Sequence, residues 1–175
     1  MRNLIVVTGP SCAGKSTFVN NLVGITRVIS TTTRPPREGE TNGVDYHFVT
    51  KDEFEKLNFI ERSEVYGNQY GITYEALERT KGNVVIIMDV YGALKFKDAY
   101  SGSATYVFVT APFEELIRRM KKRNDANNPI RIHEAWEEMK LEQEFDYTVH
   151  NAVLESEKWS ALLQRRTDVF NPGNG

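Results

Sequence analysis

Nine residues near the start of the chain constrain its fold more than any other stretch. They read Gly-Pro-Ser-Cys-Ala-Gly-Lys-Ser-Thr over residues 9–17 and fit the spacing G-x-x-x-x-G-K-[ST] of a phosphate-binding P-loop. The apolar run Leu4–Val7 before the loop predicts a buried strand, and residues 18–23 after it predict the first turns of a helix. A strand, a glycine loop and a helix in this order direct backbone N–H groups at one anion.

The P-loop spacing also assigns chemistry to single residues. The Lys15 ammonium is expected at the β- and γ-phosphates, and the Ser16 hydroxyl is expected to ligate Mg²⁺. We therefore expect a nucleotide phosphate with Mg²⁺, held also by the remaining loop positions Gly9, Ser11, Cys12, Ala13, Gly14 and Thr17. The alternative is a chance glycine turn, which the strand–helix context disfavours.

Composition narrows the class of protein. A chain of 175 residues predicts one compact domain. A net charge of −2 gives no general attraction to nucleic acid or to acidic membranes, so small-molecule nucleotides are the expected partners. The single cysteine, Cys12, cannot form an internal disulfide and fits a reducing, cytoplasmic location. No segment is long enough to span a bilayer, and a monomer or a homodimer is expected.

Strands and helices alternate along most of the chain. Apolar runs at 84–88 and 105–109 predict buried parallel strands, and Pro112 predicts the first position of a helix that ends near Arg123. Further on, the pattern predicts a helix over 133–144, a strand over 147–149, and a helix over 155–166 with Trp159, Leu162 and Leu163 on one face. This alternation predicts an α/β fold with a mostly parallel sheet.

Residues 30–80 interrupt that alternation and predict a small mixed subdomain. Its expected elements are a strand over 45–50, a helix over 51–57 opened by a capping box at Thr50 and Glu53, strand pieces at 59–60, 65–66 and 69–70 with a turn at 67–68, and a helix from Thr73 to Gly82. The polar stretch 124–131 contains Asn-Asn-Pro and is expected to be a mobile flap between two helices.

Two arginines stand beside a stiff turn in this region. Arg34 and Arg37 flank Pro35–Pro36, and two guanidinium groups with restricted backbone freedom suit a phosphate, although solvated surface arginines are the alternative. This stretch resembles the guanylate kinase family, whose T-T-R-x-P-R-x-G-E and G-x-D/E-Y signatures match residues 32–40 and 43–46. Similar segments are Phe59–Glu61, Gly67–Gly71, Met88–Gly92, Phe145–Tyr147 and Asn151, so the resemblance covers roughly residues 4–165.

The resemblance implies an architecture and an activity. The fold would be a P-loop NTPase-type parallel sheet core with helices on both faces, built from about residues 1–30, 82–123 and 133–170 of a single domain. An inserted mixed α/β subdomain, about 31–81, would bind the monophosphate, and a short lid would lie at about 124–132. The activity would be ATP-dependent phosphorylation of a purine nucleoside monophosphate, GMP or dGMP, by in-line phosphoryl transfer.

The resemblance also carries residue roles. Arg34, Arg37, Tyr46 and Tyr70 would hold the acceptor phosphate, and Ser30 would bond the base carbonyl. Glu61 would accept from guanine N1–H and the exocyclic amine, and Asp89 would lie near that amine. Asn151 would contact the ATP side. The residues expected to stabilise the transferring group are Lys15, Arg34, Arg119, Arg123 and Arg131.

Several positions depart from the family pattern. Ile72 stands where a Ser or Thr usually faces the base, with Thr73 as a possible substitute, and Ile87 stands where the core strand usually has an acidic residue. Tyr91 replaces a Gln, and residues 122–124 read Lys-Arg-Asn in place of Gly-Arg-Gly. A changed base or sugar preference, a sugar-phosphate kinase, a non-catalytic binding module and a nucleotide-sensing domain therefore remain as alternatives.

Overall fold

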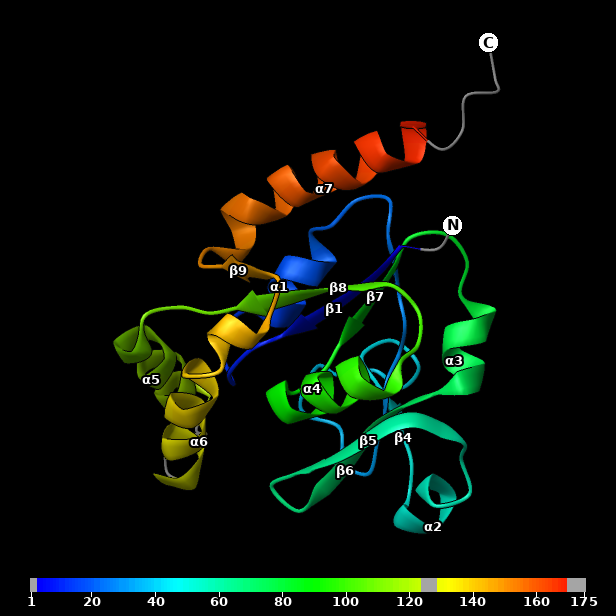
Figure 1. The fold of residues 1–175 in the computed structure, drawn as a ribbon. Helices are drawn as coiled ribbons and strands as arrows, with labels where there is room; N and C mark the ends of the chain where they lie inside the picture. The colour runs from blue at the N-terminus through cyan, green and yellow to red at the C-terminus, as the bar shows by residue number, and fades with distance from the viewer. Residues whose placement is uncertain (1–2, 124–128, 170–175) are drawn as a thin grey trace. The chain divides into compact units, whose positions relative to one another are not determined.

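The structure is a computed structural model that describes residues 3–123 and 129–169 (Figure 1). Contacts divide the chain into two compact units. Unit 1 comprises Met1–Val6 and Thr26–Thr105, and unit 2 comprises Val7–Ile25 and Tyr106–Gly175. Each unit is described by itself.

The main sheet has five strands in the order β2-β7-β1-β8-β9. They are β1 (Leu4–Thr8), β2 (Thr26–Arg27), β7 (Val84–Ile87), β8 (Ala104–Val109) and β9 (Tyr147–Val149). The β2–β7 and β8–β9 pairs are parallel. Every residue of β1 and β7 is buried, which is why both strands appear in the sequence as unbroken apolar runs. The expected parallel α/β core is confirmed.

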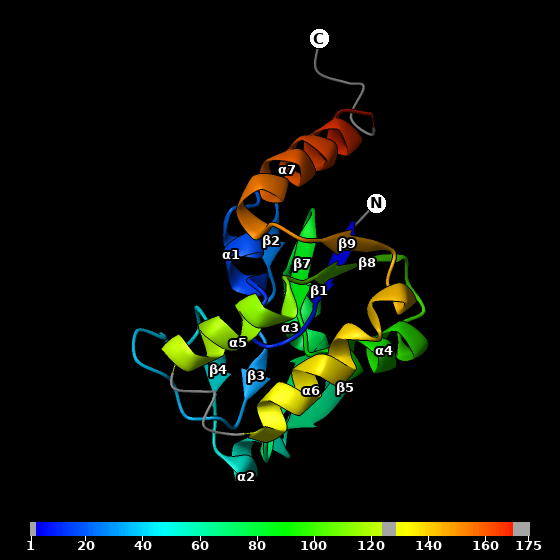
Figure 2. The ribbon, with the colours of Figure 1, turned by 90° about the vertical axis from the view of Figure 1, so that its left-hand side faces the viewer.

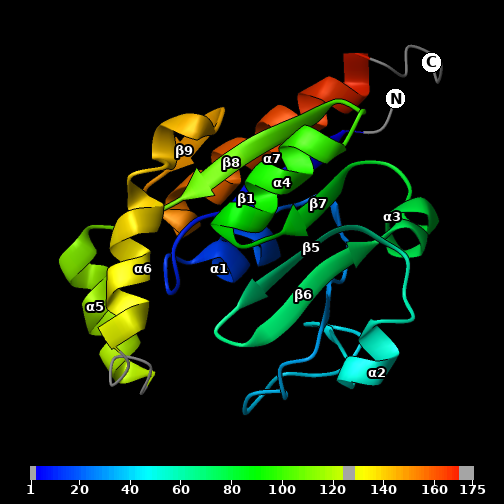
Figure 3. The ribbon, with the colours of Figure 1, turned by 60° about the horizontal axis from the view of Figure 1, so that its bottom comes forward.

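Unit 1 also contains a mixed sheet of four strands in the order β4-β3-β6-β5. They are β3 (Thr31–Thr32), β4 (His47–Phe48), β5 (Phe59–Val65) and β6 (Asn68–Thr73). Strands β3 and β4 are parallel, whereas β6 runs antiparallel to β3 and β5, and Figure 3 shows the β5–β6 hairpin. The strand predicted over 45–50 is reduced to two residues.

The β5–β6 hairpin corrects the predicted strand pieces. Strand β5 is continuous across the charged residues Arg62 and Glu64, because they alternate with the buried Glu61 and Ser63. Its turn is formed by Tyr66 and Gly67, whose φ values of 52° and 72° suit a two-residue hairpin loop. The turn therefore lies one residue earlier than predicted, and Asn68 already belongs to β6.

Three short helices complete unit 1. Helix α2 (Lys51–Phe54) begins with the predicted capping box, and its Phe54 ring stacks on Phe59 at 4.3 Å between centroids. Helix α3 (Tyr74–Arg79) is capped by Thr73 as predicted but ends before Gly82. Helix α4 (Val90–Ala99) is capped by Asp89, whose side chain accepts from the Gly92 amide.

Unit 2 begins its helices at different residues from those predicted. Helix α1 (Lys15–Asn20) starts inside the glycine loop and ends before the exposed Val23. Helix α5 (Phe113–Lys122) follows Pro112, whose ψ of 140° makes it the N-cap residue and not the first helical residue. Helices α5 and α6 (Pro129–Met139) lie side by side in Figures 1 and 3, with the Phe113 and Trp136 rings 5.0 Å apart.

The start of α6 overlaps the expected lid. Residues 124–128 of that lid lie outside the described part of the chain, whereas Pro129 to Arg131 are already helical. The described part of α6 starts at Pro129, and proline is tolerated in the first turn of a helix, where no amide donor is needed. It ends at Met139, and Glu142–Glu144 form a separate 3₁₀ turn, η1. The prediction of one helix over 133–144 is therefore wrong at both ends.

Helix α7 (Ala152–Val169) is the longest of the described helices and is drawn from orange to red in Figure 2. The Trp159 ring contacts Phe18 of α1 at 6.1 Å, and Leu163, four residues on, is buried. Leu162 is 54% exposed, so its predicted place on the buried face is wrong. Over residues 3–123 and 129–169, no helix combines the length and the apolar character required to cross a membrane.

Candidate nucleotide site

The phosphate loop, defined here as residues 9–17, lies in unit 2 and depends on glycine geometry. Gly9 and Gly14 have φ values of 134° and 103°, a region that side chains disfavour. A β-carbon at residue 9 would lie 2.0 Å from the Val109 carbonyl oxygen, so the loop passes too close to β8 for any other residue. The fixed glycines of the motif are thus required by backbone conformation and packing.

The side chains of the loop are arranged around its own carbonyls. The Lys15 ammonium donates to the carbonyl oxygens of Gly9 at 2.6 Å and Pro10 at 2.9 Å, which holds its charge over the loop. Ser16 and Thr17 are exposed in the first turn of α1. Within the described chain, no group of three or more His, Cys, Asp or Glu side chains could hold a metal ion.

Arg119 of α5 and Arg123, the residue that caps the C-terminus of this helix, contact the phosphate loop at Cys12. Arg119 Nη1 donates to the Cys12 carbonyl at 3.1 Å, and Arg123 Nη1 lies 3.3 Å from Cys12 Sγ. Arg119 Nε also donates to Glu115, and hydrogen bonds from Arg118 and Arg119 lower the pKa of Glu115 to about 2. The predicted residues Arg119 and Arg123 are therefore brought together with Lys15 and the loop.

Asn151 and Arg131 occupy different settings. The Asn151 side-chain oxygen accepts from the amides of Val153 and Leu154 at the start of α7, and a β-carbon at Gly14 would lie 3.2 Å from Ala152 Cβ. Asn151 therefore directly precedes Ala152, which packs beside Gly14 of the phosphate loop. Arg131 lies in the first turns of α6.

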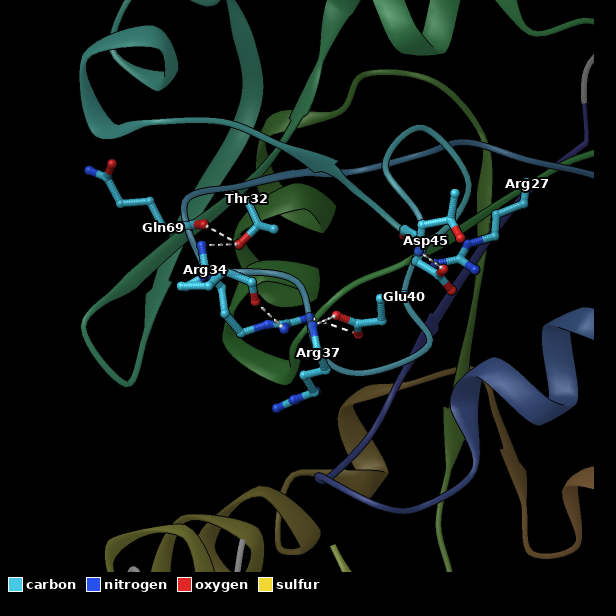
Figure 4. Close-up of polar contacts among 9 residues, drawn as sticks. Arg27, Thr32, Arg34, Arg37, Glu40, Asp45 and Gln69 are labelled. Carbon is cyan, nitrogen blue, oxygen red and sulfur yellow. Dashed lines mark hydrogen bonds and ion pairs between the residues drawn. The ribbon is translucent and has the colours of Figure 1, made fainter. Parts of the chain in front are cut away.

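The arginine loop, residues 34–40 of unit 1, is organised by Glu40 (Figure 4). Arg34 Nη2 donates to Glu40 Oε1 at 2.9 Å, and the Arg37 amide donates to Glu40 Oε2 at 2.7 Å. Arg34 Nη1 also donates to the Pro35 carbonyl at 2.7 Å. One carboxylate therefore fixes both predicted phosphate-binding residues, while the Arg37 guanidinium extends away from it.

Arg34 is 8% exposed, and its guanidinium lies beside aromatic rings. Its central carbon lies 5.5 Å from the Tyr46 ring centroid and 5.7 Å from that of Phe48. The Tyr46 and Tyr70 rings meet edge to face at 6.0 Å. Three of the four residues predicted to hold the acceptor phosphate, Arg34, Tyr46 and Tyr70, are thus clustered.

Two buried carboxylates form the other part of unit 1's candidate site. A β-carbon at Gly92 would lie 2.9 Å from Asp89 Oδ2 and 3.2 Å from Glu61 Oε1, so both carboxylates converge on the first turn of α4. Glu61 Oε1 is buried without a hydrogen-bond partner among the described residues. Burial, with a further contribution from Asp89, raises the pKa of Glu61 to about 8. We call Glu61 and Asp89 the carboxylate pair.

Among the other residues of unit 1's candidate site, three were named from the sequence and one was not. Ser30 is buried and donates to the Ile87 carbonyl at 3.4 Å. Ile72, opposite Glu61 in the β5–β6 register, is 1% exposed, and the Thr73 hydroxyl accepts from the Ala76 amide. Ser63, the residue that was not predicted, donates to Asp89 at 2.5 Å. Its signal in the sequence is its place two residues after Glu61 in an alternating strand.

Comparisons with known proteins agree with this geometry. The family model for guanylate kinase matches residues 1–164. The chain belongs to the guanylate kinase family. It is 38% identical to the guanylate kinase of Clostridium perfringens strain 13 over 177 residues, covering 91% of this chain and 82% of that one. It is also 38% identical to the guanylate kinase of Fusobacterium nucleatum over 165 residues, covering 87% of this chain and 89% of that one.

A solved structure supports the same assignment. The crystal structure of guanylate kinase from Anaplasma phagocytophilum matches with a TM-score of 0.74 at 28% identity, covering 93% of this chain and 85% of that one. Membership of the guanylate kinase family makes this chain a nucleoside monophosphate kinase that uses ATP as its phosphoryl donor. The P-loop and the arginine loop are thus parts of a phosphotransferase.

Proposed function

We propose that the chain transfers the γ-phosphoryl group of ATP to the 5′-phosphate of GMP or dGMP. The observation that carries the choice of base is the carboxylate pair at the first turn of α4. Guanine presents two neighbouring donors, N1–H and the exocyclic amine, on one edge. Glu61 can accept both when ionised, and Asp89 lies beside it; adenine offers no such pair of donors there.

The phosphate loop supports the donor half of the proposal. In it, residues 9–17 hold the ATP phosphates, with Lys15 at the β- and γ-phosphates and Asn151 on the ATP side. The exposed Ser16 hydroxyl, in a loop with no carboxylate cluster among the described residues, fits Mg²⁺ that keeps phosphate and water oxygens as its main ligands. Bound Mg²⁺ would neutralise phosphate charge.

The acceptor half is assigned to residues 31–81, with Ser30 and Asp89 at its edges. Arg34, Arg37, Tyr46 and Tyr70 hold the acceptor phosphate, while Ser30, Glu61, Thr73 and Asp89 read the base. The acceptor phosphate is mostly dianionic at neutral pH because its second pKa is about 6. No general base is therefore required, and catalysis rests on positioning and positive charge.

Positive charge for the transferring group is assigned to Arg119, Arg123 and Arg131, together with Lys15 and Arg34. The contacts of Arg119 and Arg123 with Cys12 support the first two of these assignments.

We further propose a lid at residues 124–132, and a cytoplasmic monomer or homodimer that acts on free nucleotides. Ile72, buried opposite Glu61, supports one second candidate, a kinase with a changed base or sugar preference.

A substrate panel tests the proposed function. ATP is supplied with each ribo- and deoxyribonucleoside monophosphate, and diphosphate product is measured. Turnover of GMP or dGMP well above all others is expected. A strong preference for a pyrimidine would overturn the role of Glu61, and no turnover of any monophosphate would overturn the enzymatic assignment.

Two substitutions test the halves separately. Lys15→Ala should lower kcat by orders of magnitude, whereas Lys56→Ala, at an exposed position, should not. Arg37→Ala should raise the acceptor KM about 10- to 100-fold, since hydrogen bonds to charged groups contribute about 1.5–3 kcal/mol. Arg79→Ala is its exposed control. If Arg37→Ala leaves kcat and KM unchanged with every monophosphate, the acceptor assignment is wrong.

A further inference from the structure

Strand β5 carries a second buried polar residue on the face of Glu61. Glu61 and Ser63 are each 8% exposed, and Arg62 and Glu64 between and after them are exposed. Because side chains alternate along a strand, Ser63 faces the same side as Glu61. In the β5–β6 register it lies opposite Tyr70. The serine therefore belongs to the same face as the candidate base- and phosphate-binding residues.

Ser63 makes a specific contact from this position. Its hydroxyl donates to Asp89 Oδ2 at 2.5 Å, across 26 positions of sequence. The other carboxylate oxygen, Asp89 Oδ1, accepts from the Gly92 amide at 2.8 Å. Each oxygen of Asp89 thus has a donor of its own, one from β5 and one from α4, and the carboxylate is held in a single orientation.

Glu61 has no comparable support. Its Oε1 is buried and has no partner among the described residues, although it lies at the same turn of α4 as Asp89. Hydrogen bonds to an ionised carboxylate favour the charged form, and burial without them favours the neutral form. Ser63 therefore makes the carboxylate pair unequal: each oxygen of Asp89 has a donor within the protein, whereas Glu61 Oε1 is left to find its donor on a ligand.

We propose that Ser63 is a specificity-determining positioning residue, which orients Asp89 toward the exocyclic amine of a purine and so sets the preference for bases that carry that amine. A carboxylate oxygen has two lone pairs and can accept from Ser63 and from an amine together. This inference rests on the proposed function. It concerns a residue that the sequence did not assign to the site and whose proposed effect on the base passes through Asp89.

The experiment compares GMP with IMP, which differs only in lacking the 2-amino group. With ATP fixed, kcat and KM are measured for both acceptors in the unmodified chain and in Ser63→Ala. The preference for GMP over IMP in kcat/KM should fall about 3- to 10-fold, through a higher KM for GMP, since one such hydrogen bond is worth about 1 kcal/mol. The KM for IMP should change much less.

Three controls separate positioning from a general structural role. Ser63→Thr keeps the hydroxyl and should restore the preference, and Glu64→Ala, on the exposed side of β5, should leave both substrates unaffected. In an Asp89→Asn background, Ser63→Ala should no longer alter the ratio, because its effect passes through Asp89. Equal losses for GMP and IMP, an unchanged ratio, or an undiminished effect without the Asp89 carboxylate would each overturn the proposal.

The proposed function and the positioning role of Ser63 can be refuted separately. If the unmodified chain does not phosphorylate GMP, the proposed function fails whatever Ser63 does. If it phosphorylates GMP and the Ser63→Ala ratio is unchanged, only the positioning role fails. Should Ser63→Ala prove too unstable for kinetics, the comparison of Ser63→Thr with Ser63→Cys, which replaces the hydroxyl by a weak donor, gives the same ratio test.

Discussion

Replacing Glu61 by a glutamine should change the pH dependence of folding stability. The pKa of Glu61 is raised from its ordinary value of 4.5 to about 8, first by burial and then by Asp89. Between these values the folded chain keeps a proton that the unfolded chain releases, so the free energy of unfolding must fall as the pH rises. The amide of the Glu61→Gln variant does not titrate and carries no such penalty.

The size of the effect follows from the two pKa values. Each pKa unit corresponds to about 1.4 kcal/mol, and the penalty grows over the interval from 4.5 to about 8. Between about pH 5 and pH 8 the unmodified chain should lose about 3.5 kcal/mol relative to Glu61→Gln. The loss is slightly less than about 1.4 kcal/mol for each of the three pH units, because the titration is incomplete at each end of the interval.

Urea denaturation at several pH values between about 5 and 8.5 measures this difference. The matched control is Glu64→Gln, which replaces an exposed carboxylate of the same strand. Its difference from the unmodified chain should remain nearly constant with pH. A Glu61→Gln difference that is flat, or that favours the unmodified chain as the pH rises, would refute the raised pKa of Glu61.

Two further predictions concern the same sheet. Guanine needs Glu61 ionised, so the affinity for GMP should rise about eightfold between about pH 7 and pH 8.5 and level off above the Glu61 pKa of about 8. Titration calorimetry measures this affinity at each pH. If the affinity does not rise, Glu61 does not accept hydrogen bonds from the base. Gly71→Ala should lower the free energy of unfolding by about 1–3 kcal/mol, because its β-carbon would lie 2.5 Å from Phe59 Cδ1 and 2.9 Å from the Glu61 carbonyl oxygen. An unchanged thermal midpoint would show that Phe59 moves aside without cost.

The central strands are predictable because they are buried on both faces. Strands β1, β7 and β8 appear as short apolar runs, and their length of four to six residues favours strands over helices. The sequence of strand β5 instead suggests two pieces, since Arg62 and Glu64 interrupt its apolar character. The charged residues mark its solvent face, and only the partner strand β6 shows that the backbone continues through them.

Helix boundaries are less predictable, for local physical reasons. The Asn-Asn before Pro129 favours a polar flap, yet Pro129 and the residues after it are helical, and proline is tolerated in the first turn of a helix. Leu162 follows the expected spacing closely, but the buried face of α7 is narrow and leaves this leucine exposed. Neither the helical state of Pro129 nor the exposure of Leu162 could be predicted without knowing what each helix packs against.

The candidate site divides in the same way. The P-loop and the two arginines are identifiable from short motifs, in which function fixes residues that are near in sequence. Glu40 also lies within that motif, and its contacts with Arg34 and Arg37 span only six and three positions, but the direction of its side chain is set by the turn. The Ser63–Asp89 contact joins β5 to the start of α4 across 26 positions, so the strand pattern can place Ser63 beside Glu61 but cannot pair it with Asp89.

The phosphate loop and the arginine loop hold their cations in different ways. The Lys15 ammonium donates to two neutral carbonyls of the phosphate loop, and these two contacts fix its position. Arg34 is paired with the Glu40 carboxylate, so an arriving phosphate would meet a cation whose charge is already partly compensated. Its aromatic neighbours, Tyr46 and Phe48, stabilise the guanidinium without neutralising it. Glu40 therefore fixes where the Arg34 guanidinium lies, and in the proposed acceptor site it would offset part of the attraction of Arg34 for a phosphate.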